Sequence, residues 1–193
     1  MSRKTVKRYI DILENMFLLK PLYPIHPHIT LKSTIIKSPR LYFFDPCIAI
    51  SALRINSYDL LSTTKMFISS KRTNIQDTGF FFEAQVIKHL RVYMNLLGAR
   101  IFYYRDINRV EIDAIIELKN HYVAVEIKTG SLNGIADGIK RINKFREILT
   151  KEEREKYTTF CIVTASNWTY YDKQNDINVI TLEQLFLDLK SIT

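Results

Sequence analysis

The chain has 193 residues, of which 47% are hydrophobic and 25% charged, the composition of an ordinary globular protein with one substantial core. Its formal net charge of +8 favours a polyanionic partner such as DNA or RNA, and a solvated basic surface explains the same excess about equally well. Two distant cysteines exclude a disulfide framework and a zinc site and favour a cytoplasmic setting, and the lack of an apolar run of roughly 18 residues excludes a membrane span.

The first 46 residues predict one helix followed by two strands. Apolar residues recur at helical spacing after Ser2, a preferred N-cap residue, so we expect a helix from Ser2 to about Asn15. A short strand within 16–25, an exposed basic loop over 26–39 and a second strand over 41–45 should follow. This order is typical of the last part of a winged helix, whose recognition helix meets DNA at its N-terminal end. Residues 1–46 are therefore interpreted as a partial winged helix, with three candidate DNA contacts: Arg3, Lys4 and Lys7.

Residues 47–76 predict a basic, irregular connection between two modules. Short helices are expected at Ile48–Leu53 and at Tyr58–Ser62.

Residues 77–193 alternate helical and strand patterns, which predicts an α/β module with a mixed sheet flanked by helices. Asp77 is the expected N-cap of a long helix that ends near Leu97, before Gly98. Three strands should follow, over Arg100–Arg105, Val110–Leu118 and Tyr122–Lys128, with a hairpin turn at Lys119–Asn120. The remaining expected elements are a helix over Leu132–Leu149, strands at Tyr157–Ala165 and Val179–Ile180, and a helix over Leu182–Lys190 capped by Thr181.

An aromatic group between the last two strands lies in a polar stretch that predicts a turn. It contains Trp168, Tyr170 and Tyr171. Such side chains can stack on bases, but an aromatic lid over the edge of the sheet is the favoured interpretation.

Two of the expected strands carry charged residues that a buried strand does not need. Asp113 interrupts one apolar run, and Glu126 and Lys128 interrupt the next. Alternation places Glu126 and Lys128 on the same face, and the hairpin should bring Asp113 beside them. Two carboxylates and an ammonium on one sheet face form a small site for a hard divalent cation. An ordinary half-buried strand explains an isolated Val-Glu-Ile-Lys better than a metal site does. The choice between the two therefore depends on the neighbouring elements.

The order of the charged elements resembles the PD-(D/E)xK phosphodiesterase superfamily, which has the restriction-endonuclease-like fold. That order is a helix with Glu83, a strand, a strand with Asp113, a strand with Glu126 and Lys128, and a second helix. The resemblance implies a metal-dependent DNA phosphodiesterase with four catalytic residues: Glu83, Asp113, Glu126 and Lys128.

The resemblance also implies a role for each part of this site. Asp113, Glu126 and the backbone carbonyl of Ile127 would hold Mg²⁺ or Mn²⁺, and Lys128 would position the attacking water or help to deprotonate it. Lys140 would contact the DNA backbone. Many related nucleases act as dimers, so a homodimer is one expected assembly.

The whole chain resembles the C-terminal half of prokaryotic AAA+ family ATPases. The resemblance extends over Thr5–Leu19, Pro39–Pro46, Gly79–Glu83 and the charged strands. In those proteins a winged helix and a restriction-endonuclease-like domain of unassigned function follow the ATPase domain. The ATPase motif Gly-x-x-x-x-Gly-Lys-Ser/Thr is absent from this sequence, so a separate ATPase-domain chain is an expected partner.

Simpler interpretations exist for several of these residues. Glu83 is about equally well explained as a capping or surface acid of its helix, and Glu111 and Lys140 are better explained as solvated side chains. Because a fold does not fix its function, the alternative is a non-catalytic module that binds DNA or docks on an ATPase domain.

Overall fold

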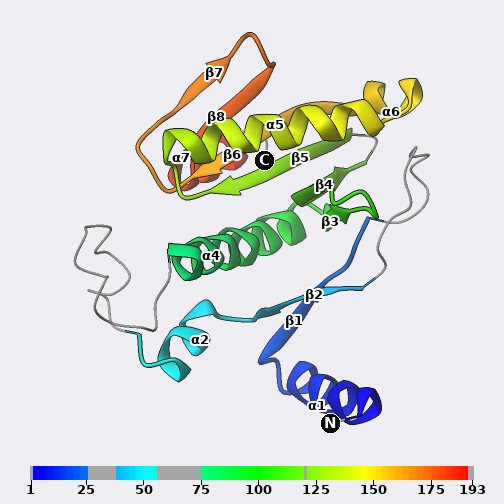
Figure 1. The fold of residues 1–193 in the computed structure, drawn as a ribbon, viewed down its shortest axis with the longest axis vertical. Helices are drawn as coiled ribbons and strands as arrows, with labels where there is room; N and C mark the ends of the chain where they lie inside the picture. The colour runs from blue at the N-terminus through cyan, green and yellow to red at the C-terminus, as the bar shows by residue number, and fades with distance from the viewer. Residues whose placement is uncertain (1, 26–37, 56–74, 120, 191–193) are drawn as a thin grey trace.

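The computed structural model describes residues 2–25, 38–55, 75–119 and 121–190 (Figure 1). Most of the expected basic loop, much of the connection over 47–76 and the helix expected at Tyr58–Ser62 lie outside these residues. The described part contains a two-stranded sheet and a six-stranded mixed sheet with helices on both of its faces. The α/β class with a mixed, helix-flanked sheet is therefore confirmed.

The N-terminal part consists of α1 (Arg3–Asn15), β1 (Leu19–Leu22), β2 (Arg40–Phe43) and α2 (Pro46–Ala52). The hydroxyl of Ser2 accepts a hydrogen bond from the backbone N–H of Thr5 at 3.2 Å, so Ser2 caps α1 as predicted. Strands β1 and β2 pair antiparallel; β1 lies within the expected range, whereas β2 begins one residue earlier and ends two residues earlier than expected. Helix α2 begins two residues earlier than expected, because Asp45 caps it by accepting from the N–H of Cys47.

The large sheet has the strand order β3-β4-β5-β6-β8-β7. Strands β3 (Arg100–Arg105), β4 (Glu111–Leu118) and β5 (His121–Lys128) form an antiparallel meander. The crossover from β5 through α5 (Leu132–Ile148) and the short α6 (Lys151–Lys156) leads to β6 (Tyr157–Thr164), which is parallel to β5. Strand β8 (Ile177–Thr181) is parallel to β6, and β7 (Tyr170–Asp172) pairs antiparallel at the edge.

Helices α4 (Ile75–Leu96) and α7 (Leu182–Lys190) pack on one face of this sheet, and α5 packs on the other. On the α5 face, Ile142 and Phe145 are fully buried among the apolar side chains of β4, β5 and β6. No helix in the described part of the chain is long and apolar enough to cross a membrane.

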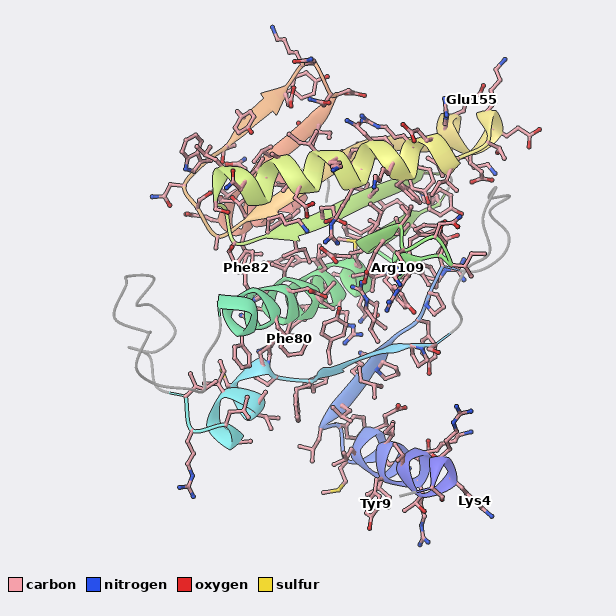
Figure 2. All side chains as sticks on the ribbon, viewed as in Figure 1. Lys4, Tyr9, Phe80, Phe82, Arg109 and Glu155 are labelled. Atoms are coloured by element: carbon pink, nitrogen blue, oxygen red, sulfur yellow. The ribbon has the colours of Figure 1, made fainter. Side chains whose placement is uncertain are left out.

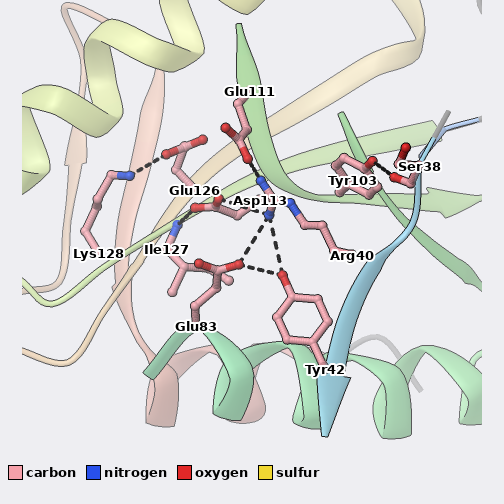
Figure 3. A network of polar contacts seen from close by, with 10 residues as sticks. All are labelled: Ser38, Arg40, Tyr42, Glu83, Tyr103, Glu111, Asp113, Glu126, Ile127 and Lys128. Atoms are coloured by element: carbon pink, nitrogen blue, oxygen red, sulfur yellow. Dashed lines mark hydrogen bonds and ion pairs between the residues drawn. The ribbon is translucent and has the colours of Figure 1, made fainter. Parts of the chain in front are cut away.

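The β1–β2 pair packs against α4 and is tied to β3. Leu22 and Tyr42 belong to the buried cluster on the α4 face. The N–H of Ile25 donates to the carbonyl of Tyr103 at 2.8 Å, and the Tyr103 hydroxyl donates to the carbonyl of Ser38. These contacts bring the beginning of β2 next to the beginning of β4, where Glu111 and Asp113 lie (Figure 3).

Two local predictions are wrong, and one helix was not predicted. Helix α4 begins at Ile75, so Asp77 lies in its first turn instead of capping it; acidic residues are favoured in both places, and the sequence does not separate them. Helix α6, capped by Thr150, was not expected, because its stretch of charged residues has no apolar periodicity. Strand β7 occupies part of the expected aromatic turn, since Tyr170 and Tyr171 pair with β8 although both remain exposed.

Replacing Gly130 by alanine is expected to destabilise the protein strongly. Gly130 has a φ of 96°, and a Cβ there would lie 2.5 Å from the Cβ of Ser166. Left-handed strain and steric overlap each cost roughly 1–3 kcal/mol, so Gly130→Ala should lower the free energy of unfolding by roughly 2–6 kcal/mol, measured by urea unfolding.

Gly98→Ala is the matched control for this substitution. Gly98 also has a positive φ of 65°, but no described atom lies within 4 Å of the added Cβ. Only the backbone strain remains, about 1 kcal/mol. Equal losses in the two variants would contradict the close packing of Gly130 against Ser166.

Candidate functional site

Asp113 lies at an irregularity of β4. The pairing register between β3 and β4 shifts between Phe102 and Tyr104, which leaves one extra residue in β4 beside Asp113. A β-bulge of this kind changes the direction of a side chain relative to plain alternation. The Asp113 carboxylate is buried, and its Oδ2 accepts a hydrogen bond from the backbone N–H of Ile127 at 3.0 Å. Asp113 is therefore fixed against β5, as the hairpin predicted.

Glu126 and Lys128 lie two residues apart on β5. The ammonium of Lys128 is 2.7 Å from Oε2 of Glu126, whose side chain is fully buried (Figure 3). Apart from this ion pair, neither carboxylate oxygen of Glu126 has a hydrogen-bond partner of good geometry among the described residues. Burial and the charge of Asp113 raise the pKa of Glu126 to about 8, although Lys128 opposes the shift. The ammonium of Lys128 therefore does not fully offset the cost of burying the ionised carboxylate beside Asp113.

Glu83 extends from α4 toward the same place. Its Oε1 accepts hydrogen bonds from the hydroxyl of Tyr42 at 2.5 Å and from Nη1 of Arg40 at 3.2 Å. Burial and the charge of Asp113 raise the pKa of Glu83, while Tyr42 and Arg40 lower it. Glu83 is therefore part of the acidic cluster, and the alternative of a capping or surface acid is wrong.

Arg40 of β2 lies at the centre of the cluster. Its Nη1 is 3.4 Å from Oδ1 of Asp113, and its Nη2 forms an ion pair with Glu111. The guanidinium also lies over the ring of Tyr103, 4.8 Å from its centroid. The sequence-based interpretation of Glu111 as a solvated acid is wrong, because Arg40 binds it in a partly buried position.

A pocket of about 600 Å³ opens beside the cluster. Three basic side chains line it, one each from β2, β5 and α5: Arg40, Lys128 and Arg141. Burial lowers the pKa of Arg141, but the carboxylates of Glu126, Asp137 and Asp113 outweigh it and raise the pKa. Basic groups beside carboxylates suit a phosphate held next to a cation.

The structure brings together the four residues predicted as catalytic, although Glu126 lies buried behind the pocket and does not line it. Three members of the site were missed. Arg40 and Tyr42 belong to no recognisable sequence motif. Arg141 directly follows Lys140, the predicted DNA contact, which is exposed. The i,i+4 ion pair of Arg141 with Asp137, at 2.9 Å, was the available signal for it.

The predicted DNA contacts of the N-terminal helix lie far from this pocket. Arg3, Lys4 and Lys7 are exposed on α1, at the opposite end of the molecule from α5 (Figure 1). Lys4 projects outward there, as does Tyr9 (Figure 2).

The donor set fits a hard divalent cation in part. Carboxylate and carbonyl oxygens suit Mg²⁺ and Mn²⁺, and Glu126 offers two buried oxygens without hydrogen bonds. Within the described ranges, however, there is no group of three or more His, Cys, Asp or Glu side chains arranged to hold a metal ion. Asp113 and Glu126 would therefore need the backbone carbonyl of Ile127 as a third protein ligand.

The raised pKa of Glu126 predicts a stability that falls with rising pH. An unfolded glutamate ionises near 4.5, whereas folded Glu126 keeps its proton up to about pH 8. Between these values the folded state binds more protons than the unfolded state, so rising pH destabilises it. Glu126→Gln should remove the part of this decline in stability that Glu126 causes. The measurement is the melting temperature of wild type and variant from about pH 5 to about pH 9 in EDTA. Parallel profiles for the variant and the wild type would contradict the raised pKa.

Two sequence families match the chain. Residues 1–59 match a domain of unknown function (DUF8612), and residues 78–185 match a second domain of unknown function (DUF4143), known from proteins associated with AAA ATPases. A search of curated proteins returned no match. The second match extends over the six-stranded sheet and the four residues predicted as catalytic, and it spans more than half of the chain. The chain therefore belongs to the DUF4143 family.

Proposed function

We propose that this chain is a metal-dependent DNA phosphodiesterase of the PD-(D/E)xK type. The carrying observation is that Asp113, Glu126 and Lys128 lie together at adjoining ends of two paired strands, with Glu83 reaching the same place from α4. A carboxylate pair with a neighbouring lysine, beside a pocket with basic walls, suits the hydrolysis of a phosphodiester.

The arrangement of elements supports the same proposal. A helix that carries Glu83, an antiparallel three-stranded meander, a crossover helix and a parallel strand follow one another as α4, β3, β4, β5, α5 and β6. This is the order on which the resemblance to the superfamily depends.

The cation of such a site is Mg²⁺ or Mn²⁺, and when bound it lowers the pKa of a water ligand and offsets charge on the phosphate. Asp113, Glu126 and the carbonyl of Ile127 are the proposed ligands. The Lys128 ammonium, held 2.7 Å from Glu126, is positioned to orient the attacking water and donate to a phosphate oxygen. Arg141, on the α5 side of the pocket, adds positive charge where the phosphate would lie.

DNA binding is the second part of the proposal. Arg3, Lys4 and Lys7 on α1, Lys140 on α5 and the net charge of +8 would attract the phosphate backbone. A homodimer would present two sites to the two strands of a duplex. Cys47 and Cys161 are not joined in a disulfide, in agreement with the proposed cytoplasmic location.

A specific observation favours a second candidate function, a non-catalytic module that binds DNA or docks on an ATPase-domain chain. Arg40 already offsets the charge of Glu83, Glu111 and Asp113 without a metal. Helix α1 has no buried residue, and Tyr9 on it and its C-cap residue Met16 are more than half exposed. An exposed amphipathic helix of this kind suits a protein partner.

The phosphodiesterase proposal predicts that Asp113→Asn abolishes metal-dependent cleavage. Wild-type protein should nick supercoiled plasmid in Mn²⁺, and the variant should be at least about 100-fold slower, because it loses a carboxylate ligand. Glu155→Gln is the matched control, since Glu155 is an exposed acid of α6 that does not line the pocket. Calorimetry should show Mn²⁺ binding in wild type and control and its loss in Asp113→Asn.

Other results select between the candidates. Mn²⁺ binding without cleavage of supercoiled or branched DNA would indicate a missing partner or substrate. Absence of Mn²⁺ binding at millimolar concentration would contradict the catalytic proposal. DNA binding that depends steeply on salt but not on Asp113 would then favour the non-catalytic module.

The DNA contacts of α1 are tested by the double variant Lys4→Gln/Lys7→Gln. Each lost phosphate contact should reduce the slope of log affinity against log salt by about 1, so the double variant should lose about 2. Lys151→Gln/Lys173→Gln is the control, because both lysines are exposed and lie outside α1. Equal slopes in the two double variants, measured by fluorescence anisotropy, would exclude α1 from the DNA interface.

A further inference from the structure

Arg40 enters the acidic cluster from a distant part of the chain. It lies 43 residues before Glu83 and 73 before Asp113, in a strand within the first matched family, whereas both acids lie within the second. Its side chain is only 19% exposed, so the cluster surrounds most of it and the rest lines the pocket. A cation supplied by one part of the chain thus occupies the acidic site of the other.

The guanidinium uses the oxygens that a metal would need. Oδ2 of Asp113 accepts from the N–H of Ile127, so Oδ1 is the oxygen left for a cation, and Nη1 of Arg40 lies 3.4 Å from it. Oε1 of Glu83 accepts from both Arg40 and Tyr42. A metal bound to Asp113 would have to take the place of Arg40.

The two cations also exclude each other electrostatically. A hard divalent ion binds carboxylate oxygen at about 2.1 Å, which would place it within a few ångströms of a guanidinium that lies on the same oxygen. Like charges at that separation repel strongly in a partly buried site. We propose that Arg40 is a competitor, tethered within the chain, for the divalent cation of this site.

The surroundings of Arg40 allow the exchange. Its guanidinium rests on the ring of Tyr103 and is partly open to the pocket. Rotation of the flexible side chain toward the pocket frees Asp113 without disrupting the pairing of β1 with β2. The inference rests on the proposed function, because it assigns a regulator to the same metal site.

Calorimetric titration of Mn²⁺ into wild type, Arg40→Gln and Arg141→Gln tests the proposal. Both variants remove one positive charge from the pocket, but only the first frees Oδ1 of Asp113, because the side chain of Arg141 pairs with Asp137. Arg40→Gln should bind Mn²⁺ at least about tenfold more tightly than either wild type or Arg141→Gln. Its melting temperature should also rise more on addition of Mn²⁺, since the metal replaces the lost cation.

The outcomes separate this inference from the proposed function. Mn²⁺ binding of equal affinity in wild type and Arg40→Gln, or equal tightening in both variants, would overturn the competition and leave the metal site in place. Absence of Mn²⁺ binding in all three proteins would overturn both.

A measurement on the wild type keeps the proposal testable if Arg40→Gln fails to fold. In ¹⁵N-labelled protein the rotation of the Arg40 guanidinium should be restricted and should become free at saturating Mg²⁺. Continued restriction at saturation would overturn the exchange.

Discussion

The ion pairs of Arg40 hold the two parts of the described chain in their observed arrangement. Four carboxylates gather where β2, α4, β4 and β5 meet: Glu83, Glu111, Asp113 and Glu126. In a partly buried site their mutual repulsion would be large without positive charge among them. Arg40 pairs with three of them at once, and this joins the β1–β2 pair to the large sheet more specifically than the apolar contacts of Leu22 and Tyr42 alone. Removal of this one side chain would leave several acids uncompensated.

The ion pairs of Arg40 stabilise the fold, but they would oppose the binding of a metal at the same oxygens. If the site takes up a divalent cation, the energy that Arg40 contributes to the fold must be given up when the metal binds. The metal would then replace the stabilisation locally, because it supplies more positive charge to the same oxygens. Arg141 can remain in place throughout, since its own ion pair with Asp137 lies on α5 and uses none of those oxygens.

The sequence predicted the parts of the site that depend on local rules. Strand alternation places Glu126 and Lys128 on one face, and the antiparallel hairpin brings Asp113 to them. Both rules relate residues that lie close together in the sequence, within one hairpin. The sequence did not predict Arg40, because its partners lie 43 and 73 residues away and no periodicity or motif relates them. Nor did it predict the bulge beside Asp113, because that bulge arises from a register shift against β3.

The uneven distribution of positive charge in the cluster is difficult to explain by stability alone. A buried polar network that only stabilises a fold would be expected to satisfy every member. Here Arg40 is shared among three carboxylates, whereas Glu126, the most deeply buried acid, has the ammonium of Lys128 and no hydrogen bond of good geometry within the described chain. The proposed exchange of one cation for another would account for this imbalance, because the acid without such a hydrogen bond and the acid that Arg40 would release are the two proposed metal ligands, Glu126 and Asp113.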